Sequence, residues 1–123
     1  MSDYGNDIYA TSEGTIYLLA MISSDTIFGK GEANETCLNY GTIIVQYNSD
    51  GTFNWAKRAI DGFASSDFDI SNTGDIVLTG MSSYTFIDTW GPGDPNQTDL
   101  SLNPSCDCGL TECADIAMGM FSP

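Results

Sequence analysis

Four cysteines are the side chains of this chain best suited to covalent or metal chemistry: Cys37, Cys106, Cys108 and Cys113. The last three follow Cys-x-Cys and Cys-x4-Cys spacing, which differs from the paired Cys-x2-Cys of common zinc sites. We therefore expect disulfides, which are typical of an oxidising exterior compartment, with metal ligation as the alternative. The spacing does not select one of the three pairings that four cysteines allow.

Calcium binding is a second candidate chemistry. Its candidate ligands are the acidic residues Asp94, Asp99, Asp107, Glu112 and Asp115. Ca2+ takes several oxygen ligands at once, but no EF-hand loop or glycine–aspartate nonapeptide accompanies these residues. Solvated loop acids are the alternative. We expect no cofactor, with Ca2+ as the one candidate ion.

Two Asn-x-Thr sequons, at Asn34 and Asn96, are candidate glycosylation sites in expected loops. Together with the cysteines they favour an extracellular or cell-surface glycoprotein.

Histidine is absent, which removes the commonest general base and any Ser/His/Asp triad. Asp67 and Asp69 share one expected strand face, a spacing that is a weak glycosidase pattern on its own. We therefore expect no catalytic residues and no enzyme.

The charge balance restricts the partners. Three basic residues against 17 acidic ones give a formal net charge of −14. Because phosphate contacts require Lys and Arg, we expect no nucleic-acid or anionic-membrane partner. No apolar run approaches the ~20 residues that span a bilayer, and Met1–Gly5 lacks the basic and apolar regions of a signal peptide.

The elements expected to position these residues are β-strands. Asp50-Gly51 predicts a two-residue hairpin turn, because such a turn requires positive φ. The apolar run Thr42–Tyr47 precedes it, and Phe53 and Trp55 alternate with more polar residues after it. Trp55 is expected to pack in the core rather than to stack on a sugar. No window has helical periodicity, so the sequence predicts an all-β protein.

The strand pattern occurs twice. Asp7–Thr11 and Thr15–Ile22 are expected strands, followed by a long connection from Ser23 to Tyr40, and the pattern restarts near Ser66. Gly14 and Gly74 are 60 positions apart, and the offset grows to 74 where Ile43–Tyr47 is matched by Ala117–Phe121. Four short strands per repeat favour β-propeller blades, which are four-stranded antiparallel sheets. We predict a first blade over residues 1–61. An incomplete second blade, with a cysteine-rich insertion at 92–113, covers 62–123.

The segments YGNDIYATSEGTIYLLAMISS, IIVQYNSDGTFNWAK and SDFDISNTGDIVLTGMSS resemble the SBBP repeat, a seven-bladed β-propeller repeat of secreted and surface proteins. The resemblance implies about one and three-quarter blades, and it brings no catalytic set. The usual basic residue of the third strand is Gln46 in the first copy and Met120 in the second. The insertion lies outside the family pattern. Closure requires four to eight blades, so we expect either a piece of a longer polypeptide or an assembly of several chains.

The expected function is a structural, adhesive or assembly role, as in a surface filament or appendage. Its partners would be other propeller blades, copies of the same chain, a surface protein or a glycan. The insertion is either a recognition loop tied by disulfides or a variable surface excursion. The missing outer strand of the second blade invites strand addition. The alternatives are a propeller that binds carbohydrate or Ca2+, and an enzyme whose catalytic blade lies outside this stretch.

Overall fold

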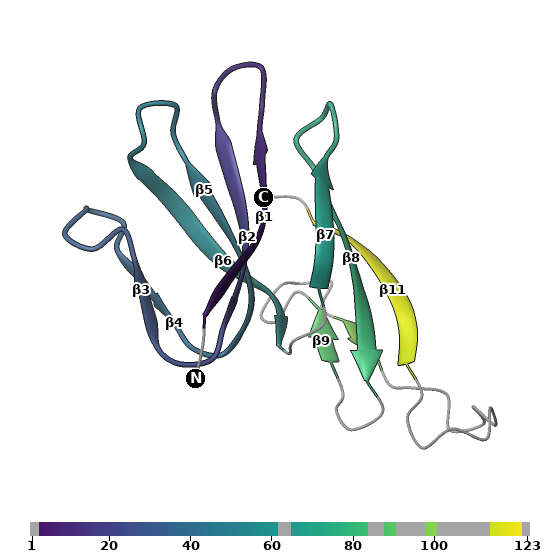
Figure 1. The fold of residues 1–123 in the computed structure, drawn as a ribbon. Coiled ribbons are helices and arrows are strands. Elements are labelled where there is room, and N and C mark those ends of the chain that lie inside the picture. Colours follow the sequence, from purple (N-terminus) through teal and green to yellow (C-terminus); the bar gives the residue numbers. More distant parts are fainter. Residues whose placement is uncertain (1–2, 62–64, 84–87, 91–97, 101–113, 122–123) are drawn as a thin grey trace.

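The computed structural model describes residues 3–61, 65–83, 88–90, 98–100 and 114–121, which form antiparallel strands (Figure 1). The prediction of an all-β protein is confirmed for this part of the chain, where no helix occurs and no sheet closes on itself. The strands are β1 Tyr4–Ala10, β2 Ile16–Ile22, β3 Thr26–Phe28, β4 Thr36–Leu38, β5 Gly41–Tyr47, β6 Phe53–Asp61, β7 Ser65–Ile70, β8 Ile76–Ser83, β9 Asp88–Trp90, β10 Thr98–Leu100 and β11 Ala114–Phe121.

The strands form two repeated units. The first unit, β1 to β6, contains the sheet β1-β2-β5-β6 and a separate two-stranded hairpin, β3–β4. The second unit, β7 to β11, contains the three-stranded sheet β11-β8-β7 and the hairpin β9–β10. Ile16 and Ile76 begin β2 and β8, 60 positions apart, while Thr26 and Asp88 begin β3 and β9, 62 positions apart. Each strand of the second unit, β7 to β11, therefore has a counterpart in β1 to β5.

The two hairpins do not occupy equivalent places. The β9–β10 hairpin continues the first sheet, because Ile60 and Asp61 of β6 pair with Trp90 and Thr89 of β9. That sheet consequently has six strands in the order β1-β2-β5-β6-β9-β10, instead of the four expected for a separate blade.

The expected long connection from Ser23 to Tyr40 contains the β3–β4 hairpin, which the sequence pattern did not reveal. Its strands have three residues each, with Thr26 opposite Leu38 and Phe28 opposite Thr36. Strands this short contain too few residues to establish an alternating pattern. Gly29 and Gly31 adopt φ of +63° and +85° between the two strands, a conformation that favours glycine.

The hairpin at Asp50-Gly51 is confirmed, but the predicted turn type is wrong. Gly51 N donates to Asn48 O and Asn48 N donates to Thr52 O, so three residues lie between the closing pair. Only Gly51 has positive φ, as expected of a type I turn followed by a glycine bulge. The turns at Gly14 and Gly74 have the same two backbone hydrogen bonds, so one turn design is used three times.

Two apolar clusters cover opposite faces of the first sheet. One lies between the two units and joins Tyr17, Leu19 and Ile44 of the first to Phe68 and Leu78 of the second. The inner strands β1 and β7 run next to each other at this junction (Figure 1). The other cluster lies on the opposite face and consists of Ile22, Ile43, Val45, Phe53 and Ala56, with Leu18, Phe28, Leu38 and Tyr47 packed against it. The β3–β4 hairpin covers this second cluster through Phe28 and Leu38.

Candidate functional site

Most residues that the sequence analysis singled out lie outside the described part of the chain. These residues outside the described part are Cys106, Cys108, Cys113, Asp94, Asn96, Asp107 and Glu112. Asp99 and Asp115 lie in β10 and β11, where the backbone alone is described. The disulfides of the insertion and its calcium ligands therefore stay predictions.

Cys37 is the described cysteine. It lies in β4 opposite Ile27 of β3, its side chain is exposed, and it makes no disulfide to a described residue. The thiol is therefore accessible on the outer surface of the β3–β4 hairpin. Its predicted bridge to the insertion stays a prediction.

The Asn34 side chain fastens the β3–β4 hairpin to the first sheet. Its Nδ2 donates hydrogen bonds to the backbone oxygens of Phe53, at 3.3 Å, and Asn54, at 2.6 Å. This is the nitrogen to which an N-linked glycan would be attached. In the folded protein a glycan at Asn34 would therefore compete with the docking of the hairpin on β6.

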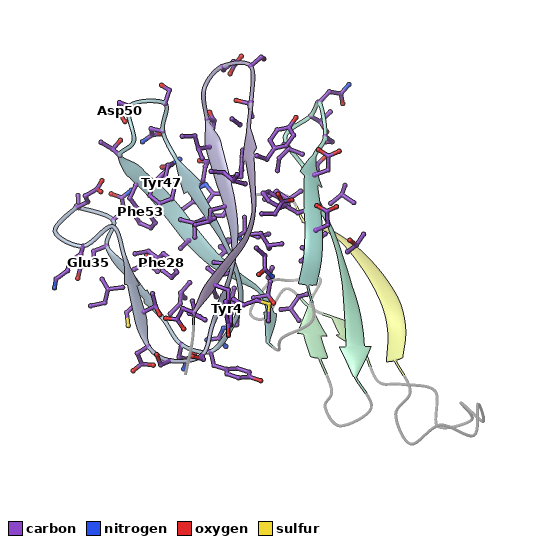
Figure 2. The ribbon with its side chains drawn as sticks, viewed as in Figure 1. Tyr4, Phe28, Glu35, Tyr47, Asp50 and Phe53 are labelled. Carbon is purple, nitrogen blue, oxygen red and sulfur yellow. The ribbon has the colours of Figure 1, made fainter. Side chains whose placement is uncertain are left out.

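Glu32 completes this docking contact. Its Oε2 accepts a hydrogen bond from Phe53 N at 2.9 Å, so both backbone groups of Phe53 bind side chains of the hairpin loop. Gly29 lies so close to β6 that a Cβ there would be 2.6 Å from Phe53 Cγ. Figure 2 shows Phe28, Tyr47 and Phe53 between the hairpin and the sheet. The start of β6 is thereby protected from pairing with another strand.

Two aspartates meet where the units join. A β-bulge precedes Asp7 in β1 and Asp67 in β7, at equivalent positions of the repeat. Asp7 Oδ1 accepts from Ile8 N at 2.8 Å, and Asp67 Oδ1 accepts from Phe68 N at 2.9 Å. Both carboxylates therefore accept a hydrogen bond from the backbone N–H of the residue that follows them.

The two carboxyl groups also approach each other across the junction, close enough for a hydrogen bond between them. This bond to Asp7 raises the pKa of Asp67, because it requires a proton, and the negative charges of Asp7 and Asp69 act in the same direction. A bulge redirects the side chain next to it, which explains how both aspartates come to the same place. The sequence repeat relates Asp7 to Asp67, but it does not predict their contact, because the contact depends on how the units pack.

The junction brings two carboxyl groups together, and the described residues provide no larger reactive set. No three His, Cys, Asp or Glu side chains of the described residues cluster to hold a metal ion.

Trp55, expected in the core, packs edge-on against Tyr17 with ring centroids 6.3 Å apart. Gln46, which stands where the SBBP repeat has a basic residue, donates to Tyr17 Oη at 2.8 Å.

Comparison with known proteins adds no relative. Scans against protein-family models, curated proteins and solved structures each found no match. In the described part of the chain, no helix is long and apolar enough to cross a membrane.

Proposed function

We propose that the chain is a non-catalytic β-propeller module of the cell exterior. Its role would be structural, adhesive or part of the assembly of a surface filament. The observation that carries this proposal is the stacking of two equivalent sheets. The second unit packs against the first through adjacent inner strands and a shared apolar cluster.

This stacking supports a repeat architecture, because a single repeat cannot bury its apolar face alone. Phe68, Ile76 and Leu78 of the second unit are buried in one apolar cluster with Tyr17, Leu19 and Ile44 of the first. Equivalent turns and equivalent bulges in both units support the same architecture. The SBBP resemblance and the sequon at Asn96 support the exterior location.

The location is tested by labelling intact cells of the source with an antibody against the folded chain. Labelling of intact cells that is lost after external protease treatment is the expected result. Labelling that requires permeabilised cells would overturn the proposal.

The role is tested by thermal unfolding with and without millimolar Ca2+ and with a panel of sugars. A structural module is expected to unfold at the same temperature in all of them. A ligand that binds the native state raises that temperature by mass action. A reproducible increase with Ca2+ or a sugar would instead identify a ligand-binding propeller.

A further inference from the structure

Among the described residues, the first unit leaves an apolar surface uncovered on strands β1 and β2. Ile8 and Ala10 of β1 lie opposite Leu18 and Ile16 of β2, so the four side chains form one continuous patch, here called the front face. Ile8 is 67% exposed, Ala10 is exposed, and Ile16 and Leu18 are half-buried. The β3–β4 hairpin covers the outer part of this side of the sheet and leaves Ile8 in solvent.

The second unit has the same surface, and there it is buried. Phe68 and Ile70 of β7 lie opposite Leu78 and Ile76 of β8, each 60 positions after its equivalent in the front face. Phe68 is 6% exposed and Leu78 is fully buried. In the described part of the chain, one copy of this surface therefore has an apolar partner and the other copy has none.

The partner of the buried copy is the opposite side of the first sheet, here called the back face. It consists of Tyr9, Tyr17, Leu19 and Ile44. The equivalent positions of the second unit are Asp69, Val77, Thr79 and Met118. Val77 and Thr79 are half-buried, and their register partners in β11 are Met120 and Met118. This back face of the second unit is more polar than that of the first.

We propose that the front face binds the back face of the second unit of another copy of this chain. The inference rests on the assembly role proposed above and extends it to a named pair of surfaces. The arrangement repeats between copies the packing that already exists within one copy. None of the four front-face residues carries a charge, so the contact adds no charged group to be desolvated on that side.

Such a contact is heterologous, since two different surfaces meet, and it continues from copy to copy until a ring closes or a filament forms. The net charge of −14 on every copy opposes association. Added salt screens that repulsion, so association is expected to strengthen with ionic strength.

The test compares two variants, each carrying one blocked surface, by analytical ultracentrifugation across concentration. Ile8→Asp blocks the front face, with Ala10→Asp as the second choice. Val77→Asp blocks the back face of the second unit, with Thr79→Asp as the second choice. Ile27→Asp is the control, because Ile27 is a 49% exposed isoleucine on β3, outside both surfaces. Circular dichroism establishes that each variant used is folded.

The wild type and Ile27→Asp are expected to form species larger than dimers. Each blocked variant alone should have an association constant lower by a factor of roughly ten or more, because a buried unpaired charge is costly. Mixing the front-blocked with the back-blocked variant should restore a one-to-one complex through the two intact surfaces.

Two results would overturn the inference. A wild type that stays monomeric at all concentrations removes the second copy as the partner. A wild type that stops at a dimer, with Val77→Asp still dimeric, means that two front faces meet instead. Neither result affects the labelling of intact cells, so failure of this interface and failure of the proposed exterior role are distinguishable.

Discussion

The two units use equivalent strands, turns and bulges, yet their short hairpins dock in different ways. In the first unit, β3–β4 covers its own sheet through Phe28 and Leu38 and binds the start of β6 by side-chain hydrogen bonds. In the second, β9–β10 joins the end of β6 by backbone pairing. Both hairpins thus protect the same strand, β6, at opposite ends.

This difference shows that a repeated sequence specifies the hairpin but not the surface on which the hairpin docks. The partner is whichever unpaired backbone or apolar surface lies within reach. A strand edge is such a surface, because its N–H and C=O groups are unpaired. The same reasoning applies to the equivalent faces of the two units, one buried and one exposed.

The largest decrease in the free energy of unfolding is expected on substitution of Leu78, which is equivalent to Leu18 in the first unit. Leu78→Ala should lower the free energy of unfolding by about 2–5 kcal/mol, because it opens a cavity between the units. Leu18→Ala should lower it by roughly 1 kcal/mol, since Leu18 is half-buried. Urea denaturation at low protein concentration measures both. Equal losses would show that the two faces are not different in burial.

The next effect concerns the docking of β3–β4. Gly29→Ala and Gly31→Ala both place an alanine at positive φ, which costs about 1–2 kcal/mol. A Cβ at Gly29 would also overlap the Phe53 ring, whereas Gly31 has open space around it. We expect Gly29→Ala to lose about 1–3 kcal/mol more than Gly31→Ala in the same denaturation experiment. A difference near zero would mean that the hairpin is not held against β6.

A smaller effect is expected at the side-chain contact that substitutes for strand pairing. Asn34→Ala removes the donors to Phe53 O and Asn54 O and should lower the free energy of unfolding by about 1 kcal/mol. Limited proteolysis should then cleave faster between residues 28 and 36. Asn72→Ala, in the exposed turn of the second unit, is the matched control and should change neither quantity. Unchanged proteolysis in Asn34→Ala would contradict the docking role.

The smallest effect is a pH dependence at the junction of the units. Because the hydrogen bond to Asp7 raises the pKa of Asp67 in the folded state, its contribution to stability is present at low pH. That contribution is lost as the pH rises from about 4 through the raised value. The melting temperature of Asp67→Asn relative to the wild type should therefore increase over this range.

Asp50 is expected to give a pH dependence of stability of the opposite sign. Hydrogen bonds from the Thr52 hydroxyl and backbone N–H lower the pKa of Asp50, so its contribution is present above the unfolded pKa and is lost on acidification. Asp50→Asn should therefore become less stable relative to the wild type as the pH rises from about 2 to 5. Parallel profiles for the two variants would contradict the opposite directions of the pKa shifts of Asp67 and Asp50.

Sequence patterns predicted the all-β class and the hairpin at Asp50-Gly51, because these depend on local properties. The period of apolar residues identifies strands, and a glycine marks a position of positive φ. The β3–β4 hairpin was missed, since three-residue strands carry no period. The turn type at Gly51 was wrong, because a sequence containing Asp-Gly is compatible with more than one loop length.

The amino-acid sequence alone therefore predicts the longer strands, the repeat that relates Ile16 to Ile76, and the acidic character of the protein. The tertiary structure decided which equivalent surfaces are buried and that Asp7 meets Asp67. It also decided that two different hairpins protect β6. The physical reason is that local propensities act within a few residues. Burial, pairing of strand edges and contacts between carboxyl groups depend on segments that lie dozens of positions apart.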